Sequence, residues 1–430
     1  MTLLVTDDVL LEIFVFYQDI CSYCTIGNNR TAWKWRTLVH VCRRWRQIVF
    51  ASPHRLDLRI LCTYSPRAAV RESLSIWPPF PIAVDYCNPQ RFITPSDEDN
   101  IIAALEHPDR VHIIGLFLTR LQLAKMVPVI QKPFPMLTHL AIFFEDGNSL
   151  VLPTDLLGGS APCLQEIYFD SFIYPALPTL LLSVSGIVTL KLHNIPWGGY
   201  ISPDTMVASL AVLTRLKNLS IKFDPVDYQP ITIHPPPPMT RAVLPALTSF
   251  EFQGDSEYLE ALVAPIAGAQ LNLIWIDYIL VDTVGFPAVQ LSKFFDRSAQ
   301  PEIMPFTLAE DCFYKSVTFD MYRCANIPPG NTHRPSTHLS LECEWILWRT
   351  HELTQVFSQF SEILSTVVYL KLDILNDKFE GSMGVEWLHL LGQFSTVQAL
   401  YIARGFAKSV ALALETSQGR GLPRRGHPLT

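Results

Sequence analysis

The chain has 430 residues, of which 49% are hydrophobic and 17% charged, and its formal net charge is −7. It can bury a large core, and it is longer than one ordinary compact domain unless it is a repeat array. The acidic balance argues against general nucleic-acid binding, which depends on neutralising phosphates. No run reaches the roughly 18 uncharged apolar residues of a membrane span, and the start lacks the basic region of a signal peptide.

The cysteines and prolines add two expectations. Nine cysteines are scattered without regular spacing, which is typical of reduced thiols and predicts a protein of the cytoplasm or nucleus. The 33 prolines exceed the average usage of about 5%. Because they recur between apolar runs, we expect many short secondary-structure elements.

The first fifty residues contain two stretches with helical spacing of apolar residues, one on each side of a predicted loop at 19–32. A block this short hides only about 60% of its chain surface, so leftover apolar surface invites a partner. The helical spacing places the following residues on the two apolar stripes: Val9, Leu10, Ile13, Phe14, Leu38, Val41, Cys42 and Trp45.

These stretches carry a family resemblance. Two acidic residues precede Leu10-Leu-Glu-Ile-Phe14, and Trp35-x-x-Leu-x-x-Val-Cys-Arg-x-Trp45 follows. The combination resembles an F-box over roughly residues 4–52. The resemblance implies a helical module, residues 1–52, that binds a Skp-type adaptor and through it a cullin, as the substrate receptor of a ubiquitin ligase. The eight stripe residues would then face the adaptor or form the module core.

One position departs from the F-box pattern. The family usually opens with a Leu-Pro pair that contacts the adaptor, and Val5 and Thr6 occupy the matching positions here. This departure keeps a second hypothesis open, namely a protein-interaction scaffold whose degenerate F-box no longer reaches a ligase.

Residues 53–108 are predicted to be a rigid connecting segment. Arg55–Leu61 alternates like a strand, a Pro-rich stretch follows at 77–82, and Asn100–Leu105 is predicted to be a helix. Two sequence segments, Ala51–Leu58 and Asp99–His107, resemble a group of F-box proteins that is expanded in mushroom-forming fungi.

A repeat follows the connecting segment. Six-residue units fit apolar-x-x-apolar-x-apolar, and their first residues lie 23 to 31 apart, close to the roughly 20–29 residues of a leucine-rich repeat. The clearest units are Leu137–Ile142, Leu164–Phe169, Ile187–Leu192, Leu216–Ile221, Leu247–Phe252 and Leu271–Ile276. Weaker units begin at Val111, Ser316, Ser336, Val367 and Val397.

The last two apolar positions of a unit would point to one face of a strand, and the first would pack the turn that enters it. Spacers at 207–213 and 258–264 have helical spacing. We therefore expect an α/β fold: the short F-box, then an irregular leucine-rich-repeat solenoid with a strand and a helix per repeat at 109–404. The tail, 405–430, is expected to be disordered or an artefact of the gene model.

A third hypothesis concerns the turn after each strand. The Asn or Cys that leucine-rich repeats place there is absent. A parallel β-helix, which would make the chain a carbohydrate-active enzyme, therefore stays open, although helical spacers are rare in such coils.

The expected site is a surface for a protein substrate, formed by outward-facing strand residues. These are His139, Glu166, Tyr168, Lys191, Lys217, Ser220 and Glu251.

Catalytic and metal motifs are weak. The chain has no Gly-rich phosphate loop, His-Glu-x-x-His helix or Gly-x-Ser-x-Gly elbow. Cys21, Cys24, His40 and Cys42 can be drawn as zinc ligands, but two residues that lie two apart on a helix point about 200° apart. We expect no metal, no cofactor and no enzymatic activity.

Overall fold

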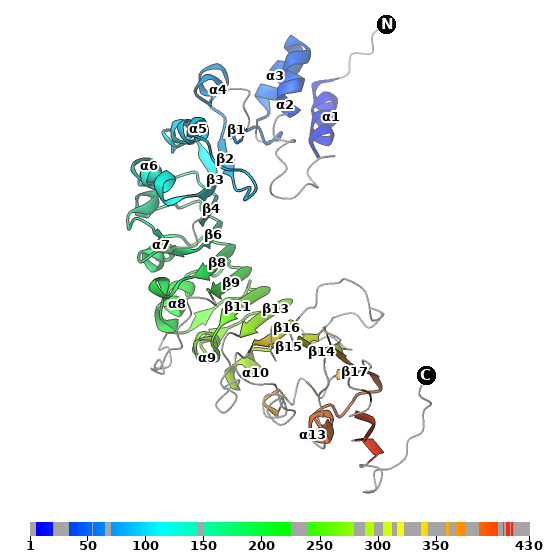
Figure 1. Cartoon of the computed structure of the whole chain (residues 1–430). Coiled ribbons are helices and arrows are strands. Elements are labelled where there is room, and N and C mark those ends of the chain that lie inside the picture. Colours follow the sequence, from blue (N-terminus) through cyan, green and yellow to red (C-terminus); the bar gives the residue numbers. More distant parts are fainter. Residues whose placement is uncertain are drawn as a thin grey trace. The chain divides into compact units, whose positions relative to one another are not determined.

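The structure is a computed structural model (Figure 1). It describes residues 6–19, 34–53, 55–64, 70–144, 150–224, 240–278, 289–295, 304–311, 316–321, 337–342, 358–360, 364, 367–374, 387–402, 407, 410–412 and 414–415. Val5, Cys21, Cys24, most of the predicted loop at 19–32 and the tail after 415 lie outside these residues. The chain divides into two compact units, Met1–Tyr200 and Ile201–Thr430.

Unit 1 (residues 1–200) is α/β. Its helices are α1 (Asp7–Asp19), α2 (Lys34–Val41), α3 (Arg43–Ala51), α4 (Val70–Ile76), α5 (Pro95–Leu105), α6 (Arg120–Ile130) and α7 (Leu177–Ser183), with 3-10 turns η1 (Leu156–Gly159) and η2 (Trp197–Gly199). Its parallel sheet has the order β1 (Ile60–Cys62), β2 (Ile82–Tyr86), β3 (Val111–Leu118), β4 (His139–Phe144), β6 (Glu166–Asp170) and β8 (Thr189–Ile195). A separate short pair joins β5 (Leu150–Val151) to β7 (Phe172–Ile173).

The strands of unit 1 follow the predicted alternation. In β4, Leu140 and Ile142 are buried and the residues beside them are half-exposed. The first apolar residue of the unit, Leu137, is also fully buried, in the turn that enters the strand. The same holds for the units that begin at Leu164 and Ile187. The predicted strands and their buried face are confirmed here. The sheet also extends into the predicted connecting segment, because β1 and β2 pair with it.

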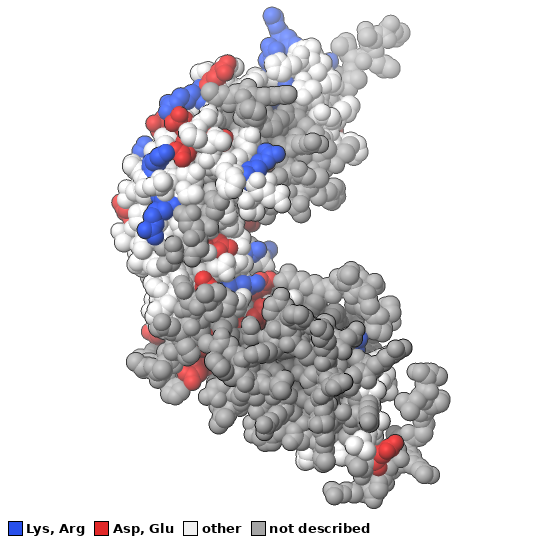
Figure 2. Space-filling model, viewed as in Figure 1, with Lys and Arg blue, Asp and Glu red and all other residues white. Residues whose placement is uncertain are grey.

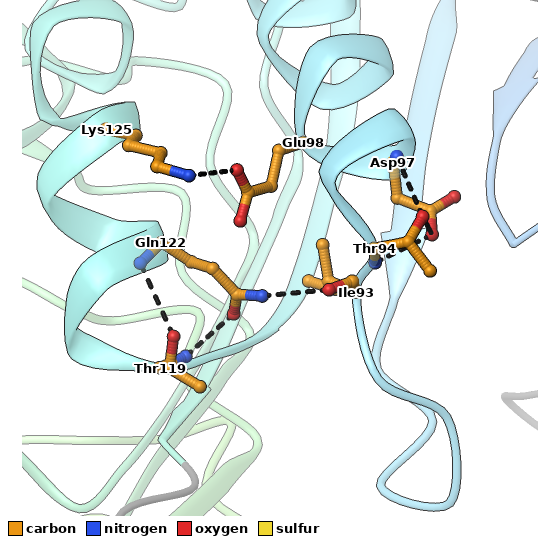
Figure 3. Close-up of polar contacts among 7 residues, drawn as sticks. All are labelled: Ile93, Thr94, Asp97, Glu98, Thr119, Gln122 and Lys125. Carbon is orange, nitrogen blue, oxygen red and sulfur yellow. Dashed lines mark hydrogen bonds and ion pairs between the residues drawn. The ribbon is translucent and has the colours of Figure 1, made fainter.

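The helices that join the strands, α4 to α7, lie along one side of this sheet (Figure 1). Two of them begin with a capping box, in which Thr94 caps α5 and Thr119 caps α6. Neighbouring helices are also linked to each other (Figure 3). Gln122 Nε2 on α6 donates to the carbonyl of Ile93, 3.0 Å away, and the Lys125 ammonium pairs with the largely buried Glu98 carboxylate on α5. Helix α6 is therefore fixed against α5.

An aromatic cluster fastens the N-terminal helices to the first strand. The ring of Trp35 on α2 lies 5.1 Å from that of Trp77 and 5.5 Å from that of Phe80, in edge contacts. The ring of Phe50 on α3 lies 5.6 Å from that of Phe80. Trp35 Nε1 also donates to the carbonyl of Arg59, the residue before β1. Aromatic pairs of this kind stabilise beyond their buried area by about 0.5–1.5 kcal/mol.

Unit 2 (residues 201–430) is also α/β. Its helices are α8 (Pro203–Leu210), α9 (Ser256–Val263), α10 (Val289–Phe295) and α13 (Trp387–Gly392). Its sheet has the order β9 (Asn218–Phe223), β11 (Ser249–Gly254), β13 (Leu273–Tyr278), β16 (Thr337–Glu342), β15 (Ser316–Met321), β14 (Met304–Asp311), β17 (Val367–Ile374) and β18 (Ala399–Ile402). A short pair joins β10 (Ala242–Val243) to β12 (Ile266–Ala267).

The first part of unit 2 matches the prediction. Strands β9, β11 and β13 are parallel and coincide with three predicted repeat units. The two predicted helical spacers are α8 and α9. Three predicted strands and the two predicted helices are confirmed in this part of the chain, although α8 begins and ends earlier in the chain than the predicted spacer at 207–213.

The second part of unit 2 departs from one parallel strand per repeat. The sequence pattern did not predict β14, and β15 runs antiparallel to both of its neighbours. Only four residues separate β14 from β15, and a parallel pair requires a crossover of a dozen or more. The prediction of a continuous parallel series is therefore wrong between β13 and β17. Among the described residues, no helix has the length and apolar character to cross a bilayer.

Candidate functional site

Helix α1 is apolar on two faces. Leu10, Leu11 and Phe14 are buried, and the ring of Phe14 lies 4.8 Å from that of Trp45 on α3. A second set, Val9, Ile13 and Phe16, is 49%, 51% and 68% exposed. These three residues recur at spacings of four and three, so they form one continuous stripe on the helix surface. We call them the α1 stripe.

The structure divides the eight predicted adaptor-binding residues into two groups. Leu10, Phe14 and Leu38 belong to the buried core of the module, and Trp45 is half-buried. Val9, Ile13, Val41 and Cys42 are exposed. The stripe also includes Phe16, which the sequence reasoning left out although it continues the spacing of Val9 and Ile13.

The predicted continuous apolar stripe over residues 38–49 is wrong at Val41 and Cys42. The helix breaks at Cys42, whose backbone is extended, and its thiol accepts a hydrogen bond from the amide of Trp45 at the start of α3. The break changes the helical phase. Val39 is buried in place of Val41, and Ile48 and Val49 are buried on α3.

The break also changes the argument about zinc. His40 and Cys42 do not lie on one continuous helix, so their helical spacing no longer bears on whether both could bind the metal. Among the described residues, no group of three or more His, Cys, Asp or Glu is arranged to hold a metal ion.

Two ion pairs orient α1 on the module. Asp7 Oδ1 accepts from Nε and from a terminal nitrogen of Arg44, at 2.8 and 2.6 Å. Glu12 pairs with Arg55, which follows α3. Both pairs are largely exposed, and such pairs contribute only about 0–1 kcal/mol each. They link α1 to α3 and to the segment that follows α3.

Four predicted substrate-binding residues come together on the exposed face of the sheet in unit 1. His139 and Glu166 are register partners, with Nε2 and Oε1 3.5 Å apart. Tyr168 pairs in register with Lys191, whose Nζ lies 5.7 Å from the Tyr168 ring. The hydrogen bond from His139 lowers the pKa of Glu166 against the opposing effect of burial, which keeps this carboxylate ionised.

Four further residues complete this face: Phe117, Phe143, Asp170 and His193. Phe143 lies 6.4 Å from Phe117 and 4.6 Å from Tyr168, measured between ring centroids. The Tyr168 hydroxyl is hydrogen-bonded to His193 Nδ1 at 2.9 Å.

Sequence reasoning missed these four because each repeat unit was ended at the sixth position of its pattern. Every one of them directly follows that position, so extending each unit by one residue finds them.

The predicted residues of unit 2 form a separate group. Ser220 was expected to be exposed, but it is only 3% exposed. Its hydroxyl donates to Glu251 Oε2, and Lys222 Nζ lies 3.3 Å from the same oxygen. These longer side chains cover the serine, which explains the correction. Lys217 is exposed just before β9, and its carbonyl accepts from the amides of Thr248 and Ser249.

The helix side of unit 1 has a different character from its sheet face. Figure 2 shows Lys and Arg side chains interspersed there with Asp and Glu side chains. Charges of both signs on helix surfaces are typical of a solvated face. The α1 stripe and the sheet face of unit 1 are therefore the stronger candidates for binding.

Compared with models of known protein families and with curated protein sequences, the chain gives no match.

Proposed function

We propose that the chain is the substrate-recognition subunit of a cullin-RING ubiquitin ligase. Residues 1–52 act as an F-box that binds a Skp-type adaptor, and the strand-and-helix repeats form an irregular leucine-rich-repeat solenoid that binds a protein substrate. The observation that carries the proposal is the α1 stripe. It is exposed and apolar, and it lies within the segment that resembles an F-box.

The exposed apolar surface of the stripe indicates that a partner binds there. A soluble surface tolerates single apolar residues, but a contiguous apolar set of this kind marks a binding site. The opposite face of the same helix already fills the core through Leu10 and Phe14. Within the described residues of the module, the stripe is therefore surface that the module itself does not use.

The repeats support the substrate-binding half of the proposal. In both units, parallel strands bury one face and leave the other to polar and aromatic side chains. The aromatic cluster around Trp35, together with the hydrogen bond from Trp35 to Arg59, joins the N-terminal module to the segments that enter β1 and β2. A receptor needs such a junction, because the adaptor has to hold the substrate at a defined place.

Two other functions are less well supported. A scaffold with a degenerate F-box is motivated by Val5 and Thr6 in place of Leu-Pro. A β-helix enzyme is disfavoured by α5, α6, α8 and α9, which join parallel strands.

Co-purification with the Skp-type adaptor tests the proposal. The full chain is co-expressed with the adaptor, beside a triple variant Val9→Ser, Ile13→Ser and Phe16→Ser. Truncating contact residues in a desolvated interface commonly costs more than about 1 kcal/mol each. We expect the parent to retain the adaptor and the triple variant to bind it at least about tenfold more weakly.

The matched control is Leu121→Ser with Leu182→Ser. These residues are 77% and 56% exposed on α6 and α7, so the control removes exposed apolar groups elsewhere and should keep the adaptor. Leu10 and Trp45 are unsuitable targets, because their burial would confuse folding with binding. If the parent itself does not retain the adaptor, the ligase function is rejected in favour of the scaffold.

A further inference from the structure

The exposed sheet face of unit 1 contains a row of register partners across four strands. Phe117 pairs with Phe143, Phe143 with Asp170, and Asp170 with His193. Tyr168, two residues before Asp170 on the same face, contacts both Phe143 and His193. We call these five residues the aromatic row.

The aromatic row is not required by the core. The residues just before its members on these strands, such as Ile142 and Phe169, are buried on the opposite face. Members of the row are half-exposed. Aromatic side chains offer large, rigid contact area at low entropic cost, so their gathering on an open sheet face indicates a binding surface.

The charges on this face favour a cationic ligand. Asp85, Glu166 and Asp170 are carboxylates on this face of β2 to β8, and Lys191 is the one Lys or Arg side chain on the same face of these described strands. Glu166 stays ionised because the hydrogen bond from His139 lowers its pKa. Among these four residues, carboxylates therefore outnumber cationic side chains three to one.

Asp170 is held in position by its neighbours. Its Oδ1 accepts from the hydroxyl of Ser171 at 2.9 Å and from Asn194 Nδ2 at 2.8 Å. A carboxylate has about four acceptor sites on its two oxygens. Within the described part of the chain, both of these bonds end on Oδ1, so Oδ2 keeps acceptor capacity. Phe143 is the register partner of Asp170 on β4.

We propose that the aromatic row binds an arginine side chain of an extended segment of a partner protein. The guanidinium stacks on Phe143 while its N–H groups donate to Asp170, a combination that suits arginine because it is planar and weakly hydrated. Lys191 over the Tyr168 ring is an intramolecular example of the same contact. That this partner is a ubiquitination substrate rests on the proposed function.

A positional library of synthetic nonapeptides tests the inference. The full chain is immobilised, and the residue selected at each peptide position is read out. We expect arginine at one position, ahead of lysine and well ahead of neutral residues. Asp170→Asn should reduce this preference at least about tenfold, and Phe143→Leu, which keeps apolar volume but removes the π face, should reduce it as well.

The matched control is Asp99→Asn, which removes one negative charge from an exposed position of α5 and should leave the selection unchanged. Thermal unfolding of each variant checks that the substitution has not disrupted the fold. Selection of acidic peptides overturns the inference in favour of an anionic ligand, and selection of no residue overturns it as well. Adaptor co-purification on the same preparations separates the two proposals, because neither result depends on the other.

Discussion

Helix α1 and the strands of unit 1 divide their apolar residues differently. The helix has one apolar face in the core, through Leu10 and Phe14, and a second in solvent, through Val9, Ile13 and Phe16. Each strand buries its apolar residues on one face, and the other is largely polar or aromatic. An apolar surface suits a stable partner, whereas a polar and aromatic one suits a selective, exchangeable partner. This division is what the proposed function requires, with a permanent adaptor on α1 and a variable substrate on the strands.

The largest expected effect compares two neighbouring residues of α1. Phe14→Ala removes a fully buried ring that contacts Trp45 and should destabilise the N-terminal module by about 3–5 kcal/mol. Ile13→Ala changes an exposed residue and should alter stability by no more than about 0.5 kcal/mol. Amide hydrogen exchange over residues 7–51 measures both.

In the adaptor-binding assay, Ile13→Ala is the informative variant, because Phe14→Ala also disturbs folding. Ile13→Ala should weaken adaptor binding without loosening the module. Equal loss of protection in the two variants would mean that α1 has no separate binding face, and the comparison with the strands would fail.

The carboxylate of Asp255 should make the stability of unit 2 depend on pH. Its Oδ1 caps α9 by accepting from the amide of Tyr258, while its Oδ2 is buried without a partner in the described structure. Burial raises the pKa of Asp255 from 3.8 to about 6. The folded state therefore binds the proton more tightly than the unfolded state, and stability falls as pH rises from 3.8 through about 6.

Asp255→Asn keeps the capping oxygen and removes the charge. At pH 7.5 the variant should be more stable than the parent, by on the order of 1–2 kcal/mol, and it should lose the gain that the parent shows on acidification. Thermal unfolding at pH 7.5 and pH 5 measures this. Asp255→Ala, which loses the cap as well, is the control, and identical pH slopes in parent and Asp255→Asn would contradict the prediction.

The smallest effect concerns the start of α5. Thr94 Oγ1 accepts from the amide of Asp97, and the Thr94 amide donates to the Asp97 carboxylate (Figure 3). Thr94→Ala should cost about 1 kcal/mol, and Thr94→Ser should cost much less. A lowered thermal midpoint for alanine alone supports the cap, whereas equal losses for both would assign the effect to packing.

Much of the fold was readable from short-range pattern. The units at Leu137, Leu164 and Ile187 are strands with the predicted buried face, since alternation of side chains on a strand is a local property. The break at Cys42 was not readable, because Val41 and Cys42 continue the apolar spacing of the helix before them. Nor was the partner of β15, because strand pairing depends on residues far apart in the chain.

For the candidate sites, the sequence by itself determined which residue types alternate on the strands and which recur on α1. Only the tertiary structure decided that Phe14 is core while Ile13 is surface, because both continue one apolar pattern and packing against α3 selects between them. It also decided that Phe143, Tyr168 and Asp170 meet, since the register between β4 and β6 is a long-range property. Local periodicity specifies the elements, and the contacts between elements specify the surfaces.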